Sequence, residues 1–274
     1  MNTIEMEKKN CPKMFYNNIE ILKICKHFIF ALLFITFARP SFSQEQRLTG
    51  DNTIGWLVYT GTFKINPKIS IHTEYQRRRV DGIKNWQQSL LRIGANYKLN
   101  DNVTVHAGYA WVETFPYGDY PIANNGTFPE HRLYEQLTLR QPTGKILFTN
   151  RFRIEQRWLG RVKAGTAGNR EIEDWVFLHR FRYQFRAQLP FLVKGDKQLY
   201  GAASDEIFIG AGKNLGINIF DQNRIFLLLG FRLNKKITIE GGYFNQTLQQ
   251  GRRINNTTII QRNNGVVLGS FLNL

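Results

Sequence analysis

Cysteine and long apolar runs are scarce in this sequence, and each scarcity excludes a class of protein. The 274 residues include only two cysteines, Cys11 and Cys25. The clearest apolar run, residues 28–37, has 10 residues, whereas a membrane-spanning helix needs roughly 20. A helical membrane protein is therefore excluded. A disordered chain is excluded as well, because aromatic residues make up 14% of the sequence.

The apolar run has the layout of an export signal. Lys23 and Lys26 precede it, and the small residues Ser41 and Ser43 follow it. We predict a signal peptide over 1–43 and one mature domain over 44–274; a short buried core helix is the alternative interpretation of the run. Both cysteines precede the predicted cleavage site, so we expect no disulfide or thiol chemistry in the mature chain.

The charge balance is strongly basic, with 37 Lys and Arg against 21 Asp and Glu and a formal net charge of +16. Such a balance is compatible with nucleic-acid binding. The export signal argues against that partner. The charges also alternate along extended segments and do not cluster on a helix. We therefore expect no nucleic-acid partner.

Apolar and polar residues alternate with a period of two along most of the chain. In residues 103–112, Val103, Val105, Tyr109 and Trp111 share one face, and polar or small residues take the other. No segment after the signal has a helical period. The alternation and the turn residues between the segments predict strands near 53–65, 69–79, 87–99, 103–113, 130–140, 145–158, 173–188, 199–210, 222–233, 237–248 and 256–274.

The connections between these segments alternate in length, which is typical of an outer-membrane barrel. Short turns are expected at 66–68, 100–102, 141–144, 194–196 and 234–236, and long loops at 80–86, 114–129, 159–172, 211–221 and 249–255. We predict an all-β, antiparallel, up-and-down transmembrane β-barrel. Eleven segments are recognisable, but bacterial barrels usually have even strand numbers, so about 12 strands are expected, with 10 possible.

Aromatic residues are expected to form two belts, as they do at the two interfaces of a bilayer. The belt at the long-loop end would contain Trp56, Trp86, Trp111, Trp158 and Trp175, and the belt at the short-turn end Tyr97, Phe148, Phe185 and Phe231. The alternative is that these rings fill the core of a soluble periplasmic β-sandwich that acts as a binding protein.

The polar face of the strands is rich in arginine and is expected to line the barrel interior. Glu155 and Glu240 are the expected ion-pair partners. A plug of ion pairs is the favoured interpretation, and an anion-preferring pore or a site for small anionic solutes is the functional one. The interior arginines are Arg92, Arg151, Arg153, Arg157, Arg180, Arg182, Arg186, Arg224 and Arg232, and the candidate binding residues are Arg151, Arg153, Glu155, Arg157, Arg180, Arg182 and Arg186.

Lipopolysaccharide is an expected partner of an outer-membrane barrel. The basic residues Arg161, Lys163, Arg170, Arg252 and Arg253 lie in expected loops and could meet its phosphates. A solvated loop surface is the favoured interpretation.

A hydrolase constellation is the main enzymatic alternative. Ser70, His72 and Glu74 share a face, but neighbours on one face of a strand are about 7 Å apart, too far for a direct nucleophile–base hydrogen bond. His179 is expected on the apolar face. The five histidines show no metal-ligand spacing, and no phosphate-binding loop is present. We expect no catalytic residue, metal or cofactor; a membrane-embedded lipid hydrolase is the alternative function.

Several short segments resemble an uncharacterised bacterial family, the domain of unknown function 2490. They are residues 150–158 (NRFRIEQRW), 180–183 (RFRY), 205–208 (DEIF), 221–224 (DQNR) and the run from 230 to 243. The likeness spans roughly residues 56–274. It implies an outer-membrane barrel of a Gram-negative bacterium, of the Bacteroidetes type, without implying any activity.

Three further expectations concern the end of the chain, one cluster of polar residues and the role of the protein. The closing residues 269–274 (GSFLNL) resemble the signal that outer-membrane barrels present to the barrel assembly machinery. Asn150, Arg151, Glu155 and Arg157 are expected to form one inward polar cluster. Together these features predict a monomeric outer-membrane barrel with a structural or passive, porin-like role.

Overall fold

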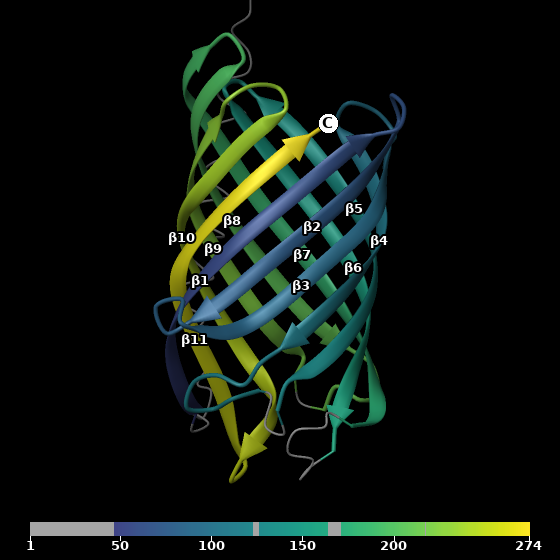
Figure 1. The fold of residues 1–274 in the computed structure, drawn as a ribbon, viewed down its shortest axis with the longest axis vertical. Coiled ribbons are helices and arrows are strands. Elements are labelled where there is room, and N and C mark those ends of the chain that lie inside the picture. The colour runs from purple at the N-terminus through teal and green to yellow at the C-terminus, as the bar shows by residue number, and fades with distance from the viewer. Residues whose placement is uncertain (1–46, 123–125, 164–170, 217) are drawn as a thin grey trace, which may run out of the picture. The chain divides into compact units, whose positions relative to one another are not determined.

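The computed structural model describes residues 47–122, 126–163, 171–216 and 218–274. The predicted signal peptide lies outside these residues. The described part forms an all-β barrel (Figure 1). Its strands are β1 (Arg47–Lys64), β2 (Ile69–Val80), β3 (Asn85–Lys98), β4 (Val103–Thr114), β5 (Phe128–Thr143), β6 (Ile146–Val162), β7 (Ile172–Lys194), β8 (Lys197–Ala211), β9 (Phe220–Arg232), β10 (Ile237–Ile254) and β11 (Thr257–Asn273).

The barrel closes through a parallel pair. Consecutive strands are antiparallel, and β1 then pairs with β11 in parallel from Arg47↔Thr258 to Thr62↔Asn273. The two strands lie side by side with their arrowheads pointing the same way (Figure 1). The described residues thus contain eleven strands, and the expected number of about twelve is not reached. A meander with an odd number of strands brings its first and last strands together in parallel, so no further strand is needed to close this sheet.

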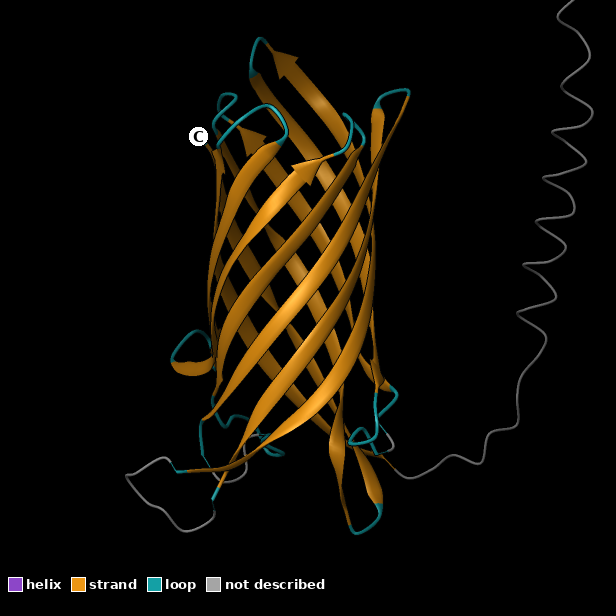
Figure 2. Ribbon diagram, turned by 90° about the vertical axis from the view of Figure 1, so that its right-hand side faces the viewer, coloured by secondary structure: helices purple, strands orange, loops and turns teal. Residues whose placement is uncertain are grey.

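Connections of different length lie at the two ends of the barrel (Figure 2). At the end that we call the turn end, short links join the strands at 65–68, 99–102, 144–145, 195–196 and 233–236. The opposite end, the loop end, carries the links at 81–84, 115–127, 163–171 and 212–219. One expectation is wrong here. The predicted loop at 249–255 is mostly strand, because β10 continues to Ile254.

A two-residue turn joins β10 to β11. Asn255 and Asn256 occupy it with φ angles of 49° and 60°. Two successive left-handed residues are the geometry of a type I′ turn, whose twist matches that of a hairpin, and asparagine tolerates this conformation. The polar sequence around the turn suggested a loop, but it belongs to strands that continue past the apolar part of the barrel.

Apolar side chains alternate between the outside and the inside of the sheet as the period of two predicts. On β9, Leu227 and Leu229 point outward and are 54% and 64% exposed, whereas Arg224 points inward and is 8% exposed. In the described part of the chain, the sheet closes on itself as a single layer. That architecture differs from a β-sandwich, in which a second sheet covers the apolar face.

One tryptophan does not join the expected outer belt. Trp175 is 42% exposed on the outside of β7, but Trp56 points into the barrel and is 4% exposed. Inside, Trp56 packs against Phe244 with their ring centroids 4.3 Å apart. The reason lies in β1, where apolar residues occur on both faces around Trp56, so that the alternation does not reveal which face is inward.

A loop folds into the barrel at the loop end. Tyr117, from the connection between β4 and β5, joins Ile54, Trp56, Val80 and Phe244 in a buried apolar cluster. The backbone oxygen of Tyr120, in the same loop, accepts a hydrogen bond of 2.8 Å from Gln261. The interior is therefore filled by a loop as well as by strand side chains. None of the described residues belongs to a helix with the length and hydropathy needed to cross a bilayer.

Candidate binding site in the barrel interior

Glu155 is the centre of an ion-pair network inside the barrel. Its carboxylate is fully buried and accepts hydrogen bonds from Arg180 Nε at 2.8 Å and from Arg182 Nη1 at 2.6 Å. Arg153 Nη1 lies 3.7 Å from the same carboxylate. All these residues alternate inward on β6 and β7, which are paired strands, so the register brings the charges together. A buried carboxylate is stable in the ionised form only with such partners.

Further carboxylates extend the network across the interior. Glu206 on β8 accepts from Arg182 Nη2 at 2.7 Å and from Arg151 Nη2 at 2.9 Å. Asp221 accepts from Arg180 Nη1 at 2.7 Å. Because Arg180 and Arg182 each bridge two carboxylates, strands β6 to β9 are joined by side chains as well as by their backbones.

The sequence-predicted binding residues all point into the barrel, but they fall into separate groups. Arg157 pairs with Glu130, Nε to Oε1 at 2.6 Å, nearer the loop end. Arg186 pairs with Glu240, Nη2 to Oε1 at 2.5 Å, nearer the turn end. The other five, Arg151, Arg153, Glu155, Arg180 and Arg182, meet in the network around Glu155 and Glu206.

Asn150 was expected in this inward cluster, and that expectation is wrong. Its side chain lies on the outer face, where it accepts a hydrogen bond of 2.7 Å from the Tyr183 hydroxyl and donates one of 3.2 Å to Gln141. Because Arg151 points inward, the alternation of the strand turns the preceding residue outward.

Three inward aromatic rings, each approached by arginines, cross the middle of the barrel. Trp56 on β1, Tyr134 on β5 and Phe208 on β8 are at most 4% exposed. We call them the arginine–aromatic layer, together with the guanidinium groups that lie over them. These groups are Arg78 and Arg224 over Trp56, Arg92 and Arg153 over Tyr134, and Arg180, Arg182 and Arg224 over Phe208.

The sequence analysis did not identify this layer. Phe208 lies in a segment whose phase is ambiguous, because apolar side chains occupy both faces of β8. Tyr134 lies on the polar face of β5, and the alternation of β5 is the signal from which its inward direction could have been found. Cation–π contacts favour such arginine–ring pairs most where water is excluded.

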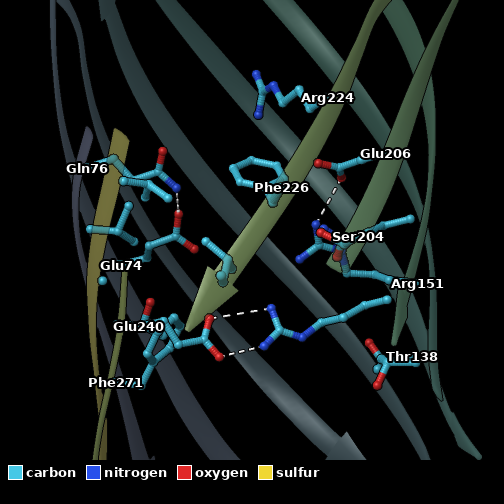
Figure 3. A pocket seen from close by; sticks show the side chains of 18 of the residues that line it. Glu74, Gln76, Thr138, Arg151, Ser204, Glu206, Arg224, Phe226, Glu240 and Phe271 are labelled. Atoms are coloured by element: carbon cyan, nitrogen blue, oxygen red, sulfur yellow. Dashed lines mark hydrogen bonds and ion pairs between the residues drawn. The ribbon is translucent and has the colours of Figure 1, made fainter. Parts of the chain in front are cut away.

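A cavity of about 510 Å³ lies on the turn-end side of the layer (Figure 3). Three glutamates line it, Glu74, Glu206 and Glu240. Its seven arginines outnumber them: Arg78, Arg92, Arg140, Arg151, Arg182, Arg186 and Arg224. The cavity therefore carries an excess of positive charge, which attracts anions and repels cations.

The lining of this cavity has an apolar side as well. Trp56, Val58, Phe226, Leu228, Val267 and Phe271 come from β1, β9 and β11, which lie on one side of the barrel. Arg151, Arg182 and Arg186 come from β6 and β7 on the other side. The two walls of the cavity thus differ in chemistry.

A second cavity of about 400 Å³ lies at the loop end, where Arg157, Asp221 and Gln250 line it. The two cavities have no lining residue in common. Glu155 and Phe208, which lie between them, are both 0% exposed. Among the described residues, the network and the arginine–aromatic layer thus contain side chains that solvent does not reach.

Tyr117 anchors the infolded loop through its hydroxyl. That hydroxyl accepts hydrogen bonds from Gln87 at 3.3 Å and from Asn263 at 3.2 Å, and donates one of 3.2 Å to Gln261. Burial raises the pKa of Tyr117 above its usual range. The hydroxyl therefore stays protonated at neutral pH and keeps its donor role.

The suggested hydrolase residues do not form a nucleophile–base pair. Ser70 Oγ accepts a hydrogen bond of 3.1 Å from Asn96, and His72 Nε2 lies 3.4 Å from Glu74. Within the described ranges, no hydrogen bond joins Ser70 to His72, and no group of three His, Cys, Asp or Glu is arranged to hold a metal. His179 contacts Phe177 on the outer face, as the sequence predicted.

The basic residues of the loop end have local partners. Arg161 pairs with Asp174 at 3.4 Å, and Arg252 donates to the backbone oxygen of Pro121 at 2.9 Å. Lys163 pairs with Glu171 at 3.2 Å. Arg170 lies outside the described residues.

The fold and this interior together define the class: a closed, single-layer β-barrel with outward apolar side chains and a charged interior. The family "Protein of unknown function (DUF2490)" matches residues 53–257. The chain belongs to this family. The resemblance seen in the short sequence segments is thereby confirmed.

Two known proteins are similar to this chain. An uncharacterized protein of Methylorubrum extorquens (strain AM1) is 29% identical over 185 residues, which is 65% of this chain and 72% of that protein. A structure of the NanC porin in a rhombohedral crystal form is 14% identical, with a TM-score of 0.41, and the match covers 75% of this chain and 92% of the porin.

Proposed function

We propose that this protein is an outer-membrane barrel of a Gram-negative bacterium with a passive, porin-like role toward small anionic solutes and no catalytic activity. The proposal includes a lumen that the interior side chains occlude. The observation that carries the proposal is the interior cavity, where seven arginines face three glutamates. The proposed partners are lipid and lipopolysaccharide around the barrel, and the barrel assembly machinery during insertion.

The outer surface supports a membrane location. Outward positions on neighbouring strands carry large exposed apolar side chains, among them Leu91, Phe152, Phe181, Leu227 and Leu268. Soluble monomeric proteins rarely expose a continuous apolar surface of this kind. In a closed barrel every backbone group is paired, so that hydrocarbon meets no unsatisfied strand edge. The predicted signal peptide is consistent with export.

The interior supports selectivity for anions and argues against free flow. Uncompensated arginines lower the energy of an anion in the cavity and raise that of a cation. Bulk conduction needs a continuous water path, and we infer that Glu155 and Phe208, which are both 0% exposed, interrupt it. The proposal therefore predicts a low, anion-selective conductance and excludes the steady conductance of a wide pore.

Planar-bilayer recording of the purified protein tests this proposal. We expect small or infrequent conductance steps. With a salt gradient across the bilayer, the reversal potential should have the sign of a channel that is more permeable to anions than to cations. A large, steady conductance would contradict the occluded lumen. A reversal potential on the cation side would contradict the role toward anions. Recovery of the protein in the aqueous fraction after cell lysis would contradict the membrane location.

A further inference from the structure

We propose that the 510 Å³ cavity binds an amphiphilic anion, with the anionic head at Arg224 and Arg78 and the apolar body along the wall formed by β1, β9 and β11. This inference rests on the proposed function and specifies the class of solute. Free carboxylates with a short alkyl chain are the simplest members of that class.

Arg224 has unused donors at the inner end of the cavity. It is 8% exposed, and its Nε donates to Gln222 at 2.9 Å. Neither of its terminal nitrogens has a hydrogen-bond partner among the described residues. Figure 3 draws no bond from this guanidinium to the other cavity residues shown. A buried guanidinium with free N–H groups is a site for a carboxylate, sulfonate or phosphate, which can accept two of them at once.

A second guanidinium lies close to the first. Arg78 and Arg224 lie 3.9 Å and 5.0 Å from the ring centroid of Trp56. Arg78 donates only to the amide oxygens of Gln76 and Gln88, so neither arginine contacts a carboxylate of the described residues. Two like charges near one ring repel each other, and an anion bound in the cavity that both line would relieve that repulsion.

The apolar wall begins beside this pair and runs toward the turn end. Phe226 and Leu228 follow Arg224 on the inward face of β9, and Phe271 on β11 lies further toward the turn end. In Figure 3, Arg224 and Phe271 lie at opposite ends of the view, with Phe226 between them. An extended molecule can thus place its charge on Arg224 and its apolar part on the rings.

The chemistry of this wall selects against fully hydrophilic anions. A small ion such as acetate gains contact with Arg224 but nothing from Phe226 or Val267. An alkyl chain gains from every methylene that it buries against them, about fourfold in affinity for each. The cavity volume is within the range of about 300–1,000 Å³ that is usual for small-molecule sites.

Isothermal titration calorimetry tests the inference. Octanoate is titrated into the protein in nanodiscs, and the heat of titration into empty nanodiscs is subtracted. We expect octanoate to bind at least about tenfold more tightly than acetate. Octylammonium, which has the same chain and the opposite charge, should not bind to the protein. Arg224→Gln should weaken octanoate binding about tenfold, because it removes a charged hydrogen bond without breaking an ion pair.

The matched control is Arg77→Gln. It removes one positive charge from the outer face of β2, next to Arg78, and should leave octanoate binding unchanged. Heat-modifiable migration on a gel shows that each variant still forms the barrel. An Arg224→Gln barrel that binds octanoate like the wild type would overturn the inference.

A probe with a quencher locates the site independently of Arg224. 2-Bromooctanoate, which carries its bromine next to the carboxylate, should quench the emission of Trp56, because Arg78 and Arg224 lie over the Trp56 ring. The wild type should therefore lose a component of fluorescence that Trp56→Phe lacks. Equal quenching of the two proteins would overturn the inference. Equal affinity for acetate and octanoate would overturn it as well but leave the proposed role toward anions intact. Absence of binding by every anion, combined with a cation-side reversal potential, would refute both.

Discussion

Replacement of Glu155 by glutamine is the most informative perturbation of the interior. The change preserves the side-chain volume and removes one buried charge. Glu155 is 0% exposed and contacts Arg180, Arg182 and Arg153. Loss of one partner from a buried ion pair costs about 3–5 kcal/mol, because the remaining charge stays desolvated.

The expected decrease in the free energy of unfolding lies at the lower end of that range, because two of the three arginines keep another carboxylate. Arg180 keeps Asp221 at 2.7 Å, and Arg182 keeps Glu206 at 2.7 Å. Arg153 keeps no carboxylate within ion-pair distance, because its contact with Glu155 at 3.7 Å is the one ion pair it has among the described residues. We therefore expect Glu155→Gln to lower the free energy of unfolding by about 3 kcal/mol.

Urea unfolding in lipid vesicles, followed by tryptophan fluorescence, measures this difference. The control is Glu135→Gln on the outer face, where Gln156 is the one described residue that donates a hydrogen bond to the exposed carboxylate; the effect of this change on the free energy of unfolding should stay within about 0.5 kcal/mol. A loss below about 1 kcal/mol for Glu155→Gln, or equal losses for the two variants, would refute the account of a network that stabilises the barrel.

Three other predictions concern the lumen and the seam. Phe208→Ala removes the ring at the centre of the arginine–aromatic layer, so single-channel conductance should increase; an unchanged current would contradict the assignment of this layer as the barrier. Tyr117→Ala should release the infolded loop and accelerate its proteolysis at neutral pH. In the wild type, the hydrogen bond donated by the Tyr117 hydroxyl is present below its raised pKa and lost as the pH rises through it, so cleavage should accelerate only at strongly alkaline pH. Cysteines at Leu57 and Leu268, which are opposite each other across the β1–β11 seam, should form a disulfide that keeps the barrel closed on a denaturing gel; failure to cross-link would contradict the parallel register.

Local sequence patterns predicted most of the strands and turns. The outward and inward faces of β4 and β7 followed from their alternation, because one face is apolar and the other polar. Where both faces are apolar, as around Trp56 and Phe208, alternation cannot assign the inward face. For that reason the inward positions of Trp56 and Phe208 were missed, whereas the alternation of β5 contains the signal for Tyr134.

Other features depend on contacts between residues far apart in the chain. The parallel closure joins Arg47 to Thr258, and no local pattern encodes which strand completes a barrel. The infolded loop is similar, because the partners of Tyr117 are Gln87 on β3 and Gln261 and Asn263 on β11. The candidate arginines point into the barrel, and the sequence could not show which carboxylate each one bonds.

The central claim is that one face of each strand meets hydrocarbon while the other lines a closed interior, and β9 offers the sharpest test. Residues Ile225 to Leu229 are all apolar, so composition does not distinguish the faces. Nitroxide labels placed singly at these five positions in lipid vesicles report collisions with dissolved oxygen. We expect high oxygen accessibility at Ile225, Leu227 and Leu229, and low accessibility at Phe226 and Leu228; uniform accessibility, or the opposite phase, would contradict the account.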